Sequence, residues 1–266
     1  MSRHPHPGGT GLRRAGQLAA TTLMALAVLL GLAGPSRAAD PPTVFAAASL
    51  AEVFPKIDRG ARFSFAGSNT LALQIRQGAP ADVFASAAPD FTRELYREGL
   101  VEKPRFLAFN RLALIVPRSN PAGIRSVYDL NRDGIKLVVA GSRVPVGSYT
   151  RTVLRNLGLS SALKNVVSQE SDVKDVLGKV VLGETDAGFV YVTDARVATA
   201  QLRTIAIPVF AQPKVRYEIA VVTDSSNRTA ARAFVARVTA TRGRALMSQA
   251  GFRFPAPPKP KRPVRR

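Results

Sequence analysis

Three short segments of the sequence place small residues where a strand is expected to give way to a helix. Ser49 follows an apolar stretch, Gly67-Ser68 precedes a helical pattern, and the run VPVGS at residues 144–148 precedes another. A helix amino end carries roughly half a positive charge and several N–H groups without partners, so it can bind an anion without a cationic side chain. A single serine there is more often an N-cap. Three such junctions favour an anion site built from neutral donors.

Strands and helices alternate along most of the chain. Apolar runs predict strands at residues 43–48, 63–66, 82–85, 112–116, 136–140, 187–191, 202–207 and 217–222. Helical patterns occupy residues 49–58, 70–75, 89–98, 148–157, 171–182, 229–241 and 244–249. We expect Ser171 to cap the helix that begins there. The alternation predicts an α/β fold with largely parallel sheets, in which ligands bind beyond the carboxyl ends of strands.

The residue inventory excludes several kinds of catalytic and metal site. The chain has no cysteine and no tryptophan, and its two histidines are His4 and His6. This excludes disulfides, metal sites made of cysteine or histidine, and nucleophiles activated by histidine anywhere beyond the amino terminus. The acidic residues form no close pair in an apolar context. We therefore expect a protein that is not an enzyme and that carries no cofactor.

Residues 1–38 have the composition of a secretory signal peptide. Arg13 and Arg14 precede an uncharged apolar stretch at residues 18–33, and Ala38 ends a Ser-Arg-Ala cleavage motif. The apolar stretch is short for a helix that spans a membrane. We expect cleavage after Ala38 and export to the periplasm or cell envelope, with an uncleaved anchor as the alternative.

Positive charge dominates the chain, whose formal net charge is +20. Residues 255–266 (PAPPKPKRPVRR) are basic and proline-rich and have no apolar periodicity, which predicts a disordered tail. Such charge raises the question of nucleic-acid binding. We expect none, because the basic residues are scattered and have no aromatic residues interleaved with them. Peripheral contact of the tail with membrane or wall polymer is the alternative role.

Four collinear segments resemble the periplasmic molybdate-binding proteins of ABC importers, which are class II solute-binding proteins. They are VFAAASL at 44–50, FAGSNTLALQI at 65–75, GAPADVFASA at 78–87 and AGFVYVTDA at 187–195. RYEIAVV at 216–222 is similar to the family's segment near the connection between its lobes. The resemblance implies a two-lobed periplasmic-binding-protein fold with the ligand between the lobes. Its implied division is residues 39–115 plus 218–254 in lobe 1 and residues 116–217 in lobe 2.

The resemblance also implies a set of ligand-binding residues. Members of that family bind their dianion with hydroxyl and backbone N–H groups and with no charged side chain. Matched position by position, the hydroxyl groups and the backbone donors fall on Ser49, Ser68, Val146, Val173 and Tyr191. The stretch after Ser49 is shorter than usual, which predicts a truncated first helix. Asn69, Val146 and Glu218 depart from the usual small residue, alanine and proline.

Together these observations predict an exported, monomeric receptor that captures molybdate or tungstate and delivers it to the permease of an ABC importer. A deprotonated tetrahedral dianion has only acceptors, so a site made only of donors fits it, whereas hydrogenphosphate brings a proton. Two alternatives stay open. One is a receptor of the same fold for another anion, such as sulfate or an organic anion bound by Arg76 or Arg143. The other is an exported basic surface-interaction protein.

Overall fold

The computed structural model describes residues 40–256, together with residues 1, 2 and 4. Most of the segment expected to be a signal peptide, residues 1–38, and most of the expected tail, residues 255–266, lie outside the described residues. Within the described part of the chain, no helix is both long enough and apolar enough to cross a membrane.

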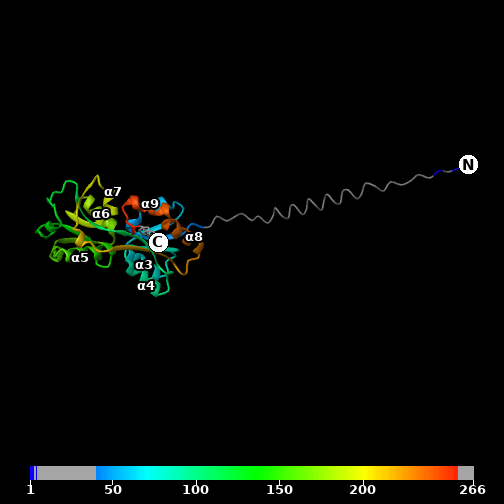
Figure 1. Cartoon of the computed structure of the whole chain (residues 1–266), viewed down its shortest axis with the longest axis horizontal. Coiled ribbons are helices and arrows are strands. Elements are labelled where there is room, and N and C mark those ends of the chain that lie inside the picture. The colour runs from blue at the N-terminus through cyan, green and yellow to red at the C-terminus, as the bar shows by residue number, and fades with distance from the viewer. Residues whose placement is uncertain (3, 5–39, 257–266) are drawn as a thin grey trace, which may run out of the picture. The chain divides into compact units, whose positions relative to one another are not determined.

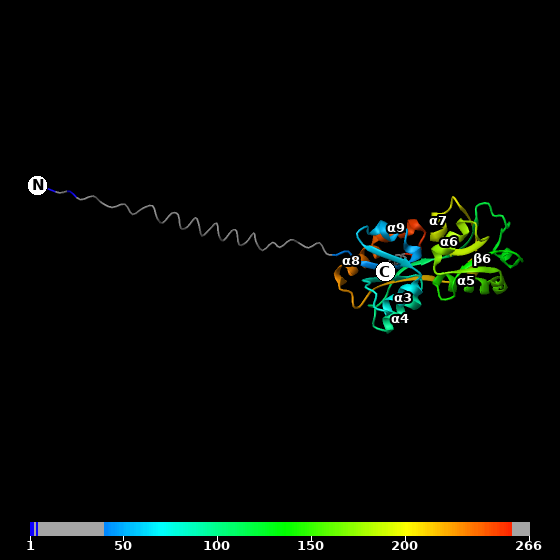
Figure 2. The ribbon, with the colours of Figure 1, turned by 180° about the vertical axis from the view of Figure 1, so that it is seen from behind.

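Two five-stranded sheets form the framework of residues 40–256 (Figure 1). The first sheet has the strand order β2-β1-β3-β10-β4. Its strands are β1 (Thr43–Ala47), β2 (Arg62–Ala66), β3 (Val83–Ser86), β4 (Arg105–Asn110) and β10 (Val215–Val221). Seen from behind, helices α3 (Ser68–Arg76) and α4 (Pro89–Arg97) lie on one side of it, and α8 (Arg228–Thr239) and α9 (Thr241–Ala250) on the other (Figure 2).

The second sheet has the strand order β7-β6-β8-β5-β9. Its strands are β5 (Leu112–Pro117), β6 (Leu137–Ala140), β7 (Val166–Glu170), β8 (Ala187–Tyr191) and β9 (Leu202–Ile205). Its helices are α5 (Pro145–Asn156), α6 (Val173–Val181) and α7 (Val192–Val197). The remaining short elements are η1 (Ala48–Leu50), α2 (Phe54–Ile57), η2 (Val127–Asn131), η3 (Ser160–Asn165) and η4 (Val209–Ala211).

The chain passes from one sheet to the other twice. The first crossing is at Arg111, between β4 and β5, and the second lies between β9 and β10. The lobe boundary expected after Ile115 falls inside β5, and the return expected at Glu218 falls inside β10. Both boundaries need correction, because a run of apolar residues predicts a buried strand without indicating which sheet it joins.

Both sheets are mixed, so the expectation of largely parallel sheets is wrong for half of the strand pairs. β1 is parallel to β2 and β3, and β6 is parallel to β7 and β8. β10 and β5 are antiparallel to both of their neighbours. These two strands each follow a crossing, and no α-helix separates either of them from the strand before it, so the strand-helix-strand rule for parallel pairing does not apply to them.

Local predictions succeed where the apolar pattern is strong. β8 has the predicted bounds, and every residue of β5 is buried, as its uniform apolar run requires. β4 and β7 were not predicted, and β7 is only partly buried, with no apolar run. The helix expected over residues 49–58 consists of the two short pieces η1 and α2. The N-cap of α6 is Asp172 rather than Ser171.

The apolar core extends through both lobes. One cluster of buried side chains contains Val44 and Phe54 of the first lobe together with Leu114 and Phe189 of the second. Phe54 packs edge-on against Phe234 of α8, with ring centroids 5.4 Å apart. Because this packing is continuous beside the crossings, it holds in place the strand ends at which the two lobes face each other.

Candidate functional site

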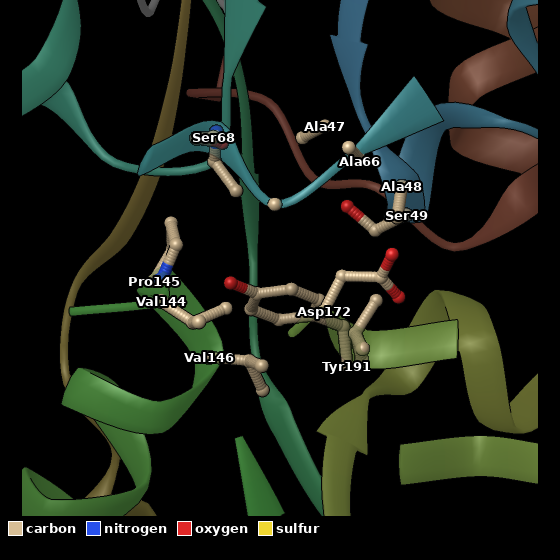
Figure 3. Close-up of a pocket in the computed structure, with 13 residues that line it drawn as sticks. Ala47, Ala48, Ser49, Ala66, Ser68, Val144, Pro145, Val146, Asp172 and Tyr191 are labelled. Carbon is tan, nitrogen blue, oxygen red and sulfur yellow. The ribbon is translucent and has the colours of Figure 1, made fainter. Parts of the chain in front are cut away.

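One pocket lies between the two sheets, where strands and helices of both lobes meet (Figure 3). The first lobe lines it with Ala47, Ala48, Ser49, Ala66, Gly67, Ser68 and Ala87, and the second with Val144, Pro145, Val146, Asp172, Val173 and Tyr191. All five residues that the sequence singled out therefore line a single pocket.

Ser68 is the first residue of α3 and is almost fully buried. Its hydroxyl oxygen accepts a hydrogen bond from the backbone N–H of Ala87, at 3.0 Å. The oxygen is thereby held in place while the hydroxyl proton is not consumed, because a serine hydroxyl has one donor and two acceptor positions. Ser68 can therefore donate to an anion in the pocket.

Ser49 occupies the first of the three junctions, in the η1 turn after β1. Its hydroxyl oxygen lies 2.7 Å from the hydroxyl of Tyr217, a buried residue of β10 that is 168 positions away in the sequence. Figure 3 shows the Ser49 hydroxyl on the first-lobe side of the pocket. The contact with Tyr217 fixes its position.

The second lobe presents the start of α5, where Val146 is the second helical residue. Pro145 has no N–H, and no side chain caps this helix, so the N–H of Val146 has no intrahelical acceptor. Gly147 brings the helix against the end of β6, because a Cβ there would collide with the carbonyl oxygens of Ala140 and Gly141. The glycine thus sets how closely the α5 N–H groups approach the pocket.

The start of α6 supplies Val173, the first residue of that helix. The Asp172 carboxylate caps the helix by accepting from the N–H groups of Lys174 and Asp175, at 2.6 Å and 3.2 Å. Neither capping bond involves the N–H of Val173, which as the first N–H of the helix has no acceptor within it.

Asp172 itself also lines the pocket, so the lining contains a carboxylate and the expectation of donors alone is wrong. Burial raises the pKa of this carboxyl above its ordinary value, while the Lys174 N–H opposes the shift. The sequence analysis did not single out Asp172, because the preceding residue, Ser171, was expected to cap the helix.

Tyr191 ends β8 and is 1% exposed. Its hydroxyl points into the pocket (Figure 3), and among the described residues it has no hydrogen-bond partner. Burial raises its pKa well above the ordinary value, so the hydroxyl keeps its proton at physiological pH. A buried polar group without a partner is costly, and a ligand that accepts from Tyr191 would remove that cost.

The two lobes approach each other closely beside the pocket. Lys174 of α6 lies 3.3 Å from the carboxylate of Glu52 in the first lobe. The Tyr149 hydroxyl of α5 donates to the carbonyl of Ala87 at 3.4 Å. Gly67 lies so close to Ser171 that a Cβ would be 2.6 Å from the Ser171 carbonyl oxygen. The two lobes are thus in contact beside the pocket.

A second acid that the sequence did not single out lies beside this closed interface. Asp194 is 1% exposed, and its carboxylate lies 3.6 Å from the Lys174 ammonium. Burial raises its pKa to about 7, and Lys174 opposes that shift. Lys174 therefore contacts Asp194 within its own lobe and Glu52 across the interface between the two lobes.

The arginines considered for an organic anion do not line the pocket. Arg76 is paired with Glu94 and Glu98, at 3.0 Å and 2.8 Å. Arg143 is also absent from the lining, and no lysine or arginine is among the described lining residues. A ligand in this pocket would therefore be bound by neutral donors.

Comparison with known proteins agrees with this architecture. The family model for bacterial extracellular solute-binding proteins matches residues 41–253. The chain belongs to this family. It is 40% identical over 233 residues to the molybdate-binding protein ModA of Mycobacterium tuberculosis, covering 84% of this chain and 88% of that protein. It is 31% identical over 224 residues to ModA of Haemophilus influenzae, covering 78% and 88%.

The fold of this family member is also found in a solved structure. The periplasmic molybdate-binding protein of Azotobacter vinelandii superposes with a TM-score of 0.71 at 20% identity, covering 81% of this chain and all (100%) of that one. The predicted two-lobed fold and the resemblance to molybdate-binding proteins are both confirmed. These relatives are substrate-binding transport proteins rather than enzymes.

Proposed function

We propose that this protein is an exported receptor that captures molybdate, or tungstate, and delivers it to the permease of an ABC importer. The observation that carries the proposal is the pocket itself. Three hydroxyl groups and two helix amino ends converge there from both lobes, and the buried Tyr191 hydroxyl still has a proton to donate. The 40% identical relative named for molybdate binding supports the same ligand.

The chemistry of the lining suits a tetrahedral dianion. Every oxygen of such an ion is an acceptor, and burying the ion is tolerable only when its oxygens are hydrogen-bonded. Ser49, Ser68 and Tyr191 would supply hydroxyl donors, and Val146 and Val173 would supply backbone N–H groups at helix amino ends. Molybdate, tungstate and sulfate carry the same charge, so the radius of the closed cavity must separate them.

Asp172 favours one competitor, hydrogenphosphate. A carboxylate in the lining can accept the proton that hydrogenphosphate carries, whereas molybdate has no proton to offer it. Its negative charge is partly offset by the helix amino end that it caps. Phosphate is therefore the second ligand that deserves a direct comparison.

Closure would complete the donor set. We propose that the anion first contacts Ser49 and Ser68, and that rotation about the two crossings then brings α5, α6 and Tyr191 onto it. The contact between Lys174 and Glu52 and the close approach of Gly67 to Ser171 would form only in the closed state. The importer would recognise this closed form.

Export and retention complete the proposal. The amino-terminal segment would direct the monomeric protein to the periplasm or cell envelope, and the basic residues 255–266 would contact anionic membrane or wall polymer. Deleting residues 255–266 should abolish sedimentation with anionic vesicles without changing affinity for the oxyanion. Loss of oxyanion binding on this deletion would instead favour a surface-interaction role.

Thermal unfolding of the mature protein tests the ligand. Molybdate, tungstate, sulfate and phosphate are added separately at equal concentration, because a ligand of the native state stabilises it by mass action. A large rise in melting temperature with molybdate and tungstate alone supports the proposal. A rise with phosphate alone would assign the pocket to phosphate through Asp172, and no rise with any of the four would overturn the oxyanion assignment.

A further inference from the structure

The side chain of Lys174 joins two segments that each carry a pocket residue. Its ammonium lies 3.3 Å from the carboxylate of Glu52, and Glu52 follows the pocket residue Ser49 by three positions. Lys174 itself directly follows Val173, which lines the opposite wall. Among the ion pairs of the described residues, this pair alone links the two lobes. The pair therefore connects the two walls of the pocket.

A buried acid holds the same ammonium from within the second lobe. Asp194 of α7 is 1% exposed, and its Oδ1 lies 3.6 Å from Lys174 Nζ. Neither oxygen of this carboxylate has a hydrogen-bond partner among the described residues. A buried carboxylate without a nearby cation is costly, so Asp194 favours keeping Lys174 beside it. Both residues belong to the second lobe, so this contact does not depend on the first lobe.

The backbone of Lys174 is fixed as well. Its N–H donates to Asp172 Oδ1 at 2.6 Å, in the cap of α6. An exposed ion pair usually contributes little, in part because two long side chains must be ordered to form it. Here Asp172 and Asp194 already restrict Lys174 within its own lobe. Pairing with Glu52 therefore costs less conformational entropy than such a pair usually does.

We propose that Lys174 is a positioning residue that stabilises the ligand-bound arrangement of the two lobes, with Asp194 holding its ammonium and Glu52 receiving it across the interface. This inference rests on the proposed function and deepens it, because it names a residue that links closure to affinity. Lys174 does not line the pocket, so it acts through the approach of the two walls rather than by touching the anion. The neutral donors of the lining still make the direct contacts.

Reversing the charge of Glu52 gives a test that depends on the direction of the effect. Glu52→Lys adds positive charge near an anion site, so long-range attraction alone predicts tighter binding of molybdate. The proposal predicts the opposite, because two ammonium groups would meet when the lobes approach each other. We expect calorimetry on the mature protein to show molybdate affinity lowered by roughly threefold or more. An unchanged or raised affinity would overturn the inference.

A double-mutant cycle then isolates the pair itself. Molybdate affinity is measured for the wild type, Glu52→Gln, Lys174→Met and the double variant, so that the separate effects of each charge cancel. We expect the double variant to bind roughly two to five times more tightly than the product of the single effects predicts. Lys174→Arg should stay within about twofold of the wild type, because it keeps the charge and is no shorter.

Lys179 and Glu184 provide the matched control pair. They lie 3.0 Å apart, and their side chains are 32% and 50% exposed, against 27% and 49% for Lys174 and Glu52. Both lie in the second lobe, so their contact does not depend on closure. The cycle of Lys179→Met and Glu184→Gln should therefore show no coupling in molybdate affinity.

The melting temperature without ligand is measured for every variant to confirm that it is folded. If the effects of Glu52→Gln and Lys174→Met simply multiply in the double variant, or if the control pair shows the same coupling, the inference is wrong. If Lys174→Met does not fold, Glu52→Lys decides the question, because it changes only an exposed side chain. A wild type that binds no molybdate would instead overturn the proposed function.

Discussion

The two walls of the pocket are prepared for a ligand in different ways. On the first-lobe wall, Ser49 shares a hydrogen bond with the Tyr217 hydroxyl, and Ser68 accepts one from the Ala87 N–H. On the second-lobe wall, the Tyr191 hydroxyl has no partner among the described residues, and the α5 amino end carries no capping side chain. The difference indicates a preorganised wall that receives the anion and a second wall whose donors are satisfied only when the lobes close over it.

Blocking closure should have the largest effect. A Cβ at Gly67 would be 2.6 Å from the Ser171 carbonyl oxygen of the other lobe and 2.7 Å from Asn69 Oδ1 of its own lobe. The Asn69 side chain can turn away, so the backbone collision with Ser171, which arises when the lobes meet, is the one that matters. We expect Gly67→Ala to lower oxyanion affinity by about a hundredfold, equivalent to roughly 2.7 kcal/mol, measured by calorimetry. The melting temperature without ligand should change little, because the open lobes can relieve the collision.

Gly178→Ala is the matched control for that substitution. Gly178 lies in α6, and a Cβ there would have no neighbour within 4 Å. This variant should bind the oxyanion as the wild type does. Equal affinities in the two glycine variants would show that the approach of Gly67 to Ser171 plays no part in binding.

Removing one hydroxyl from each wall should separate the walls most clearly. Tyr191→Phe and Ser68→Ala should each weaken binding by about 1 to 3 kcal/mol, the cost of a donor lost to a buried charged ligand. Without ligand, however, Ser68→Ala should lower the melting temperature, because the Ala87 N–H loses its acceptor. Tyr191→Phe should not, since its hydroxyl has no partner. Equal destabilisation of both ligand-free variants would contradict the comparison.

Asp194 should make the stability of the second lobe depend on pH. Its native pKa is raised to about 7, so the native state binds more protons than the unfolded state between roughly pH 4 and 7. Its contribution is therefore favourable at low pH and is lost as the pH rises through that window, by about 1 kcal/mol from pH 5 to pH 6.

Asp194→Asn should remove this dependence, which urea unfolding at several pH values would measure. The variant should gain stability relative to the wild type as the pH rises toward 7, and the gain should level off above it. A difference between variant and wild type that stays constant from pH 4 to pH 8 would contradict the raised pKa.

The smallest effect is expected from neutralising Asp172. Asp172→Asn keeps a side chain that can cap α6 and removes a negative charge from the lining. Molybdate affinity should rise several-fold, whereas phosphate should gain less because its proton loses an acceptor. A fall in molybdate affinity measured by calorimetry would mean that the carboxylate supports the site.

The sequence predicted the pocket better than it predicted the contacts behind the pocket. Ser49 and Ser68 lie at strand-to-helix junctions that the local pattern indicates, whereas Tyr191, Val146 and Val173 were assigned through the resemblance to a family. The partners of these residues could not be inferred in this way. Tyr217 meets Ser49 across 168 positions, and only the fold brings them together.

The errors in the fold have the same physical origin. β5 and β10 were predicted as strands from their apolar residues, but their direction and sheet depend on where the chain crosses between lobes. The α6 cap was assigned to Ser171, whereas Asp172 accepts both helix N–H groups. Neighbouring polar residues compete for the cap position, and only backbone geometry at the helix start decides between them.

A crystal structure of the mature protein with molybdate would test the central claim most directly. We predict one tetrahedral ion in the pocket, within hydrogen-bonding distance of the Ser49, Ser68 and Tyr191 hydroxyls and of the N–H groups of Val146 and Val173. An ion bound outside this pocket, or held there by a lysine or arginine side chain, would contradict the account.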